Sequence, residues 1–398
     1  MTFFAHKNIV LECGVVIDIG SGSVGVAIII SNKETGALQA VWSHREYMLI
    51  KEYTDSQQLL REISTTLINA LLELGGTGMK ELSSLDEKHK ISRIQVTFSA
   101  PWAHTATKTV QYEKNEPFVV QESFINDLVK ATKNAETDTE NTEKLNELGL
   151  QIIGENVVQM TLNEYVVQNP VNKKATTASL SVITSAVQEK ILQTVQESCS
   201  KIFSGVPIEY FSFINVFYQV LRHLKPATSE VCIVDITNEA TEIGIIRDDV
   251  LRHITFVSSG LYGLARSIAK KCNIPNEEAY ALLKNKKDDA LEMYSVKVQE
   301  QIAAVFEEYE GQIVKLFSDT GDQLTIPKTI FVHTSLQTEE FFNKRLKSAA
   351  KKATGHEHVV NLVTKELFTD IEVEDSALAV SIYYFHNHYL FKKFDISN

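Results

Sequence analysis

A cluster of small polar residues follows an aspartate near the start of the chain. Asp18 stands near the end of a β-branched run and is followed by Gly20, Ser21, Gly22 and Ser23. Glycines let backbone amides approach a phosphate closely, and serine hydroxyls add donors. An aspartate at a strand end is placed to hold Mg²⁺ through water, since this hard cation prefers oxygen ligands. The turn is therefore a candidate phosphate and metal site, with an ordinary hairpin turn as the alternative.

A second aspartate has a similar setting in the middle of the chain. Asp235 ends an apolar run and is followed by Thr237, Asn238, Glu239 and Ala240. Asp235 could again face a metal ion. Glu239 puts a carboxylate where a phosphate would lie, so it either points outward or serves as a general base or water-positioning group. The alternative is that this turn has lost its phosphate role.

The two aspartates mark an internal repeat with an offset of 217 positions (235 − 18). Laying Asp18 on Asp235 also pairs Ile17 with Val234. Each copy is an apolar strand, a small polar turn and an apolar strand that returns. Two such units, each continuing into α/β structure, predict a pseudo-symmetric two-lobed protein with a cleft between the lobes.

Other elements follow from the spacing of apolar residues. A third strand is expected at Val41–Ile50, and leucines at helical spacing predict a helix at Asp55–Leu74 that ends at Gly75–Gly76. Val157–Gln168 and Ala178–Ala186 are expected to be paired strands. The polar segment 135–149 is expected to be a loop.

Composition limits the class of protein. The chain has 398 residues, enough for two to four packed units, and a net charge of −12 with a pI near 5.5 makes it a poor match for nucleic acid. It has no apolar window of the length that spans a membrane, and Met1–Asn8 is too short and too polar for a signal peptide. The four cysteines have neither zinc-site nor redox-motif spacing. These features favour a cytoplasmic protein.

At this point the motifs resemble a known superfamily. Val16–Ser23 looks like the first phosphate motif of actin, sugar kinases and heat-shock chaperones, and Val234–Gly244 looks like the second. Val157–Tyr165, Asn169–Val171 and Ala178–Ala186 are similar to a stretch in FtsA and PilM. The chain is identified by this order of motifs as an FtsA/PilM-like member of the superfamily, over about residues 10–390.

The resemblance implies an α/β, actin-like fold of two RNase-H-like lobes, with a small α+β insert domain on the first lobe. The expected units are 1–90, the first lobe with the first phosphate turn; 91–187, the insert; 188–228, the first lobe continued; 229–272, the second lobe with the second phosphate turn; 273–325, a helical upper subdomain; and 326–398, the second lobe continued and a C-terminal helix that returns to the first lobe.

The resemblance also implies ATP with Mg²⁺ in the cleft. Asp18 and Asp235 would be metal-side carboxylates and, with Glu239, the catalytic groups. The implied nucleotide contacts are Gly20, Ser21, Gly22, Ser23, Thr237, Asn238, Gly260, Lys284, His333 and Thr334. The chain departs from the family where glycines are usual, with Asn238 and Glu239 in the second motif and His333 and Thr334 in the adenosine motif. A Cβ at these places would crowd a nucleotide, so at most a weak ATPase is expected.

The function that the resemblance implies is an adaptor or scaffold of cell division or type IV pilus assembly. Its partners would be other subunits of such a complex, among them the cytoplasmic peptide of a membrane protein, or further copies of the chain. The protein would then be cytoplasmic, or peripheral at the inner face of the membrane through that partner. The alternatives are a small-molecule phosphotransferase of the sugar-kinase type and a pseudo-ATPase that keeps only the shape.

Overall fold

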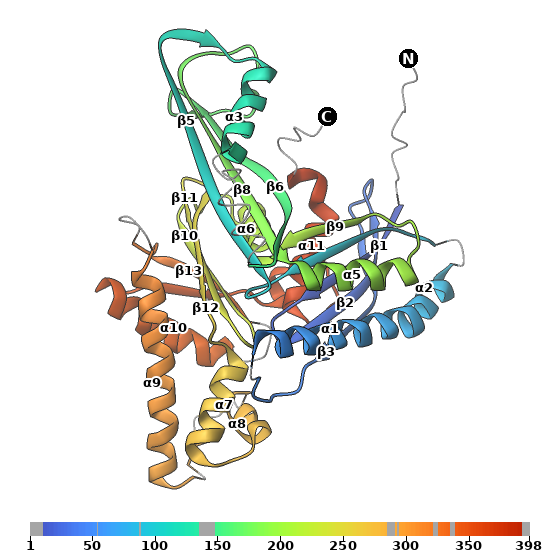
Figure 1. The fold of residues 1–398 in the computed structure, drawn as a ribbon, viewed down its shortest axis with the longest axis vertical. Helices are drawn as coiled ribbons and strands as arrows, with labels where there is room; N and C mark the ends of the chain where they lie inside the picture. Colours follow the sequence, from blue (N-terminus) through green and yellow to red (C-terminus); the bar gives the residue numbers. More distant parts are fainter. Residues whose placement is uncertain are drawn as a thin grey trace.

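The computed structural model describes residues 11–53, 55–86, 89–134, 148–284, 291–292, 294–320, 325–334 and 339–391. Residues 135–147 of the expected loop lie outside these ranges. Within them the chain forms two five-stranded sheets with helices around them, and a third sheet that projects from the body (Figure 1).

The first sheet is an antiparallel meander extended on one side by two parallel strands. In spatial order its strands are β3 (Leu38–Tyr47), β2 (Ser23–Asn32), β1 (Leu11–Ile19), β4 (Ile91–Phe98) and β9 (Ile208–Ser212). Nearly all side chains of β1 and β2 are buried, as their β-branched sequences require. Both faces of this sheet are therefore covered by helices.

The second sheet repeats the first. In spatial order its strands are β12 (Val250–Val257), β11 (Thr241–Arg247), β10 (Val231–Ile236), β13 (Thr329–Thr334) and β14 (Val359–Leu362). Strand β10 is antiparallel to β11 and parallel to β13, as β1 is to β2 and β4. The predicted repeat and the two-lobed α/β architecture are confirmed.

The helices form layers on and between the sheets. Those of the first lobe are α1 (Ser56–Glu73), α2 (Met79–Leu85), α5 (Glu189–Ile202) and α6 (Phe213–Leu224). Those that follow are α7 (Leu261–Cys272), α8 (Asn276–Lys284), α9 (Val296–Ser318), α10 (Glu339–Thr354), the 3₁₀ turn Lys365–Leu367 and α11 (Ser376–Phe391). Side chains of α6 and α11 share one buried cluster with both sheets, so these two helices join the lobes.

The expected end of the first helix at Gly75–Gly76 is wrong. The helix continues through a π-helical turn, Leu74–Gly78, directly into α2. A Cβ at Gly78 would lie 2.7 Å from the Trp42 ring, so this glycine lets the helix pack closely on β3. Gly78 therefore serves helix–sheet packing, and Gly75 and Gly76 lie within the continuing helix without ending it.

The projecting sheet is antiparallel and carries its own small core. It consists of β5 (Ala103–Val119), β8 (Lys174–Gln188), β6 (Leu150–Leu162) and the two-residue β7 (Tyr165–Val166), with α3 (Glu122–Asn134) packed against it. Because β4 belongs to the first sheet, the separate unit begins after β4 and not at residue 91, where the insert was expected to begin.

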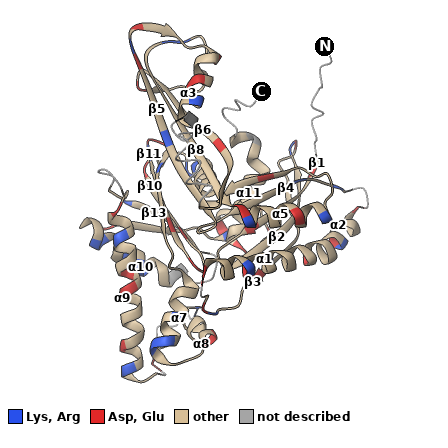
Figure 2. Cartoon of the chain, in the orientation of Figure 1, with Lys and Arg blue, Asp and Glu red and all other residues tan. Residues whose placement is uncertain are grey.

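The surface carries both signs of charge. Basic and acidic residues are interspersed on the outer helices α1, α5 and α9, while α10 carries mainly basic residues (Figure 2). Among the described residues, no helix is both long and apolar enough to cross a membrane.

Candidate functional site between the lobes

The two predicted phosphate turns lie against each other. The Ser21 hydroxyl of the first turn donates to the Thr237 hydroxyl of the second at 2.7 Å, and it accepts the backbone N–H of Glu239 at 2.7 Å. The Thr237 hydroxyl in turn donates to the Ala240 carbonyl at 3.1 Å. Ser21 and Thr237 are buried. The polar groups that were expected to face a phosphate therefore satisfy one another across the lobe boundary.

Backbone packing closes the same boundary. A Cβ at Gly22 would lie 2.6 Å from the Asn238 side chain and 2.9 Å from the Tyr262 ring. The Gly22 carbonyl accepts the Met48 N–H at 2.9 Å, and the Tyr262 hydroxyl donates to the Met48 carbonyl at 3.2 Å. Gly22 is thus a close-approach position whose neighbour is the second lobe.

Asp18 is paired with an arginine from β3. Its Oδ2 accepts the Arg45 Nη2–H at 2.7 Å, and its Oδ1 accepts the Thr97 hydroxyl at 3.1 Å. Both side chains of the ion pair are buried, with 2% of Asp18 and 6% of Arg45 exposed. Burial raises the pKa of Asp18, against the attraction of Arg45.

Arg45 also holds a second carboxylate, which comes from the start of α11. Its Nε and Nη2 both donate to Asp375, the latter at 3.1 Å, and its Nη1 donates to the Ser23 hydroxyl at 2.9 Å. Burial opposes the charge of Asp375, but Arg45 outweighs it and lowers the pKa of that carboxyl. The converse holds for Arg45, whose pKa is raised by Asp375 and Asp18 against the effect of burial. One guanidinium thus serves two carboxylates and a hydroxyl.

Asp235 is paired with a histidine on the parallel neighbouring strand. Its Oδ1 accepts the His333 Nδ1–H at 2.7 Å, while His333 Nε2 is 3.1 Å from the Ser376 hydroxyl. The imidazole is 1% exposed and packs beside the rings of Phe213 and Phe217. The other oxygen of Asp235, Oδ2, is buried without a hydrogen-bond partner among the described residues.

Glu239 points away from the turns and toward α7. Its two carboxylate oxygens accept bonds from the two terminal nitrogens of Arg266 at 2.7 and 2.6 Å. The pair lies at the edge of an open pocket of about 490 Å³ that Glu52, Tyr53 and Asp55 also line. Burial first, and then the negative charge of Glu239, raise the pKa of Tyr53 to about 12. The expected role of Glu239 as a base or water-positioning group has no support in this bidentate pairing.

Of the other residues that were expected to contact a nucleotide, some lie near the two turns and Lys284 does not. Gly260 lies against the second turn, where a Cβ would be 2.3 Å from the Thr237 carbonyl. Gly20 accepts the Trp102 indole N–H on its carbonyl at 2.8 Å, and Thr334 is buried at the end of β13. Lys284 is exposed on α8, and its ammonium lies 4.5 Å from the centre of the Tyr280 ring. Among the described residues, the structure shows no contact between Lys284 and the two turns.

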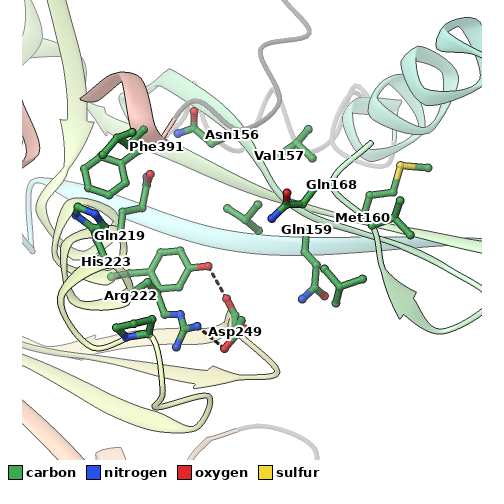
Figure 3. A pocket seen from close by; sticks show the side chains of 16 residues that line it. Asn156, Val157, Gln159, Met160, Gln168, Gln219, Arg222, His223, Asp249 and Phe391 are labelled. Atoms are coloured by element: carbon green, nitrogen blue, oxygen red, sulfur yellow. Dashed lines mark hydrogen bonds and ion pairs between the residues drawn. The ribbon is translucent and has the colours of Figure 1, made fainter. Parts of the chain in front are cut away.

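A separate groove of about 460 Å³ runs between the projecting sheet and α6 (Figure 3). One wall is formed by Asn156–Met160 of β6 and by Val166–Gln168. Tyr218 and Arg222 of α6 and Phe391 at the end of α11 form the other. None of the charged residues of the two turns lines this groove.

The turn between β11 and β12 fixes the floor of the groove. The Gln159 side chain donates to the Asp248 carbonyl at 2.8 Å, and the Tyr218 hydroxyl donates to the Asp249 carbonyl at 2.7 Å. Arg222 forms an ion pair with the Asp249 carboxylate. The groove is therefore built from the projecting sheet and from both lobes.

Comparison with known proteins finds similar folds but little similarity of sequence. No family model and no curated protein sequence matches the chain. A chain of the solved PilM–PilN type IV pilus biogenesis complex matches 94% of this chain and 98% of its own length, with 11% sequence identity and a TM-score of 0.57. The chain has the actin-like two-lobed fold. FtsA, the other half of the expected resemblance, is not singled out by this match.

Two weaker structural matches cover as much of the chain. The ethanolamine utilization protein EutJ of Carboxydothermus hydrogenoformans matches 94% of this chain and 90% of its own, with 12% identity and a TM-score of 0.42. A Bacteroides thetaiotaomicron protein with an actin-like ATPase fold and unknown function matches 95% and 99%, with 9% identity and a TM-score of 0.40. Identities this low describe the fold alone.

The residues present in this actin-like chain do not fit a Mg²⁺–nucleotide complex. The guanidinium of Arg45 already lies on the carboxylate that was expected to face the metal, and it would repel a divalent cation. The Asp235 carboxylate is held by His333, and the Ser21 hydroxyl is used within the lobe boundary. A phosphotransferase of the sugar-kinase type would need the same groups, so the geometry does not favour that alternative either.

Sequence reasoning missed Arg45, Asp375 and Arg266. Arg45 lies in the polar run Ser43–Glu46 of an expected strand, a pattern typical of an exposed edge. Asp375 lies in the expected unit 326–398, and its local sequence does not mark it as a partner of Arg45. The sequence offers one indication of such residues, a charged side chain at a predicted strand end or helix cap. Charged residues are common at these positions, so the sequence alone does not show which of them form ion pairs with one another.

Proposed function

We propose that this chain is an actin-fold adaptor of the PilM kind, which holds an extended segment of a protein partner in the groove between the projecting sheet and α6. The observation that carries the proposal is the unpaired edge of β6 beside that groove. Within the described residues β6 pairs with β8 along its length. On its other side the backbone pairing shown is confined to its C-terminal end, where it pairs with β7 at Thr161 and Leu162 and the Met160 carbonyl accepts the Val167 N–H at 2.9 Å. A strand edge of this kind accepts a further strand through backbone hydrogen bonds.

The side chains around this edge favour an apolar segment. Val166 and Leu390 line the groove and are 65% and 41% exposed, and the partly buried Val157 adds apolar surface. An extended segment presents alternate side chains to one face, so apolar residues at every second position would lie on this surface. The volume of the groove is in the range that binding sites have.

The structural match supports a protein, as opposed to a small molecule, as the partner. The matching chain is part of a complex of PilM with PilN in type IV pilus biogenesis. By analogy the partner here is a subunit of a pilus or division complex, such as the cytoplasmic segment of a membrane protein, and the chain would act at the inner face of the membrane through it. The adaptor role uses the groove and requires no reaction at the lobe boundary.

The test is a binding assay with synthetic peptides that match the cytoplasmic segments of single-span membrane proteins from the source organism. Fluorescence anisotropy should find a peptide that binds the wild type, and Val166→Glu should weaken it at least about tenfold, because a charge would be buried against the apolar wall. Tyr165→Glu is the matched control. Tyr165 is the other residue of β7, is 78% exposed and does not line the groove, so its substitution should leave affinity unchanged.

Three results would count against the adaptor. No peptide in the panel binds, or both substitutions weaken binding equally, or sedimentation shows that a second copy of the chain occupies the β6 edge. Equal melting temperatures of the two variants would show that a loss of binding is local.

A further inference from the structure

The carboxylates at Arg45 form a ligand set that a divalent cation would also accept. Asp18 comes from β1, Asp375 from the start of α11 and Ser23 from the start of β2, and each directs an oxygen at the guanidinium. Asp18, Asp375 and Arg45 are buried or nearly so, with 2%, 18% and 6% of their side chains exposed. Carboxylate and hydroxyl oxygens that converge on one positive charge are the donors that Mg²⁺, Mn²⁺ and Ca²⁺ prefer.

A glycine makes room for the arginine. Gly25 is the cross-strand partner of Asp18 on one side and of Arg45 on the other. A Cβ at Gly25 would lie 2.6 Å from Arg45 Nη2 and 2.9 Å from Cζ. The guanidinium therefore crosses β2 over the bare backbone of Gly25 and reaches Asp18 two strands away.

Hydrogen bonds between the lobes occur at further places. Besides the Ser21 bonds, the Asn276 amide donates to the Ile50 carbonyl at 2.9 Å across the boundary. The projecting sheet adds two bonds to the second lobe, from the Thr107 hydroxyl to the Leu251 carbonyl and from Arg252 to the Thr109 hydroxyl. Contacts at three separated places thus fix the closed arrangement of the lobes.

We infer that Arg45 is a built-in replacement for a divalent cation, and that the lobes of this chain are closed by their own side chains and not by a metal–nucleotide complex. The proposal concerns the lobe boundary and stands apart from the groove, so it can fail while the adaptor function holds. It predicts that the wild type is indifferent to metal and nucleotide, and that removal of the guanidinium uncovers a cation site.

The first experiment uses the wild type. Its melting temperature should not change with millimolar Mg²⁺ or Mg²⁺–ATP, and calorimetry should detect no binding of either. A rise in melting temperature with Mg²⁺–ATP that disappears in Asp18→Asn would overturn the inference.

The second experiment uses Arg45→Ala, which leaves the two carboxylates facing the space of the guanidinium. Mn²⁺ should bind, with a loss of its free EPR signal, and raise the melting temperature by about 2–5 °C. The double variant Arg45→Ala/Asp375→Asn is the control and should lose this response, because one of the two carboxylates is gone. If Arg45→Ala does not fold alone, Mn²⁺ should restore its near-UV circular dichroism. A variant that neither binds Mn²⁺ nor is restored by it refutes the inference.

Discussion

Asp18 and Asp235 occupy the same place in two sheets of the same topology, yet their side-chain partners approach from opposite sides. The cross-strand partner of Asp18 is Gly25, and Arg45 reaches over it from β3. The cross-strand partner of Asp235 is Glu242, and His333 approaches from β13 on the other side. Positions 25 and 242 differ by the repeat offset of 217 (242 − 25). The repeat therefore preserves the backbone, while the residue opposite each aspartate differs, and with it the side from which the aspartate's hydrogen-bond partner comes.

The two aspartates should also differ in how much their partners contribute to stability. In the first lobe a permanent cation lies between two carboxylates, so the removal of Arg45 leaves two buried carboxyl groups without the cation that they share. In the second lobe the partner of Asp235 is an imidazole, and one carboxylate oxygen has no partner among the described residues. The first-lobe arrangement should therefore be the more sensitive of the two to substitution.

The largest expected effect is that of Arg45→Met. This change keeps most of the side-chain volume but leaves Asp18 and Asp375 unpaired, so the free energy of unfolding should fall by about 3–5 kcal/mol. Urea denaturation followed by circular dichroism measures it. Arg266→Met is the matched control, because its ion pair with Glu239 is more exposed, at 20% and 10%, and should cost about 1 kcal/mol. Equal losses in the two variants would remove the distinction.

Gly25→Ala should have the next largest effect. Its methyl would meet Arg45 Nη2 at 2.6 Å and also the Leu378 side chain at 3.0 Å, so we expect a loss of about 1–3 kcal/mol. The loss should be smaller in the Arg45→Met background, because the atoms that the methyl meets first are gone. A double-mutant cycle measured by urea denaturation gives the coupling energy between positions 25 and 45. If the two losses are strictly additive, Gly25 is not needed to make room for Arg45.

These contacts mark the limit of what the sequence predicts. The offset of Asp18 and Asp235 predicts the repeat, the two lobes and the nearness of the turns, because strand ends in equivalent units meet at one boundary. Arg45 is paired with Asp18, 27 positions before it in the chain, and with Asp375, 330 positions after it. Only the strand register and the return of α11 bring them together, and neither is encoded in a local pattern.

The same limit explains the nucleotide prediction. A Gly-Ser-Gly-Ser turn after an aspartate is suited to phosphate, but Ser21 and Gly22 are equally suited to close packing against another turn. Which partner they take depends on Thr237 and Asn238, more than 200 positions away. The departures at Asn238 and His333 were visible in the sequence as Cβ atoms in place of glycines. Their consequence, a boundary filled by the chain itself, needed the fold.

In the second lobe, the stability of the protein should depend on pH through Glu242. Burial first, and then the neighbouring Asp235 carboxylate, raise the pKa of Glu242 well above 4.5, against a hydrogen bond from the Ala100 N–H. Above about pH 4.5, Glu242 therefore keeps its proton in the folded protein and loses it in the unfolded chain. Stability should therefore fall as pH rises from about 4.5 through the folded pKa, by at most about 1.4 kcal/mol per pH unit. Glu242→Gln cannot ionise and should not show this fall, so its advantage over the wild type should grow with pH in urea denaturation between pH 5 and 8. If the two proteins have parallel stability profiles, Glu242 is ionised in the folded state beside Asp235, and the prediction is wrong.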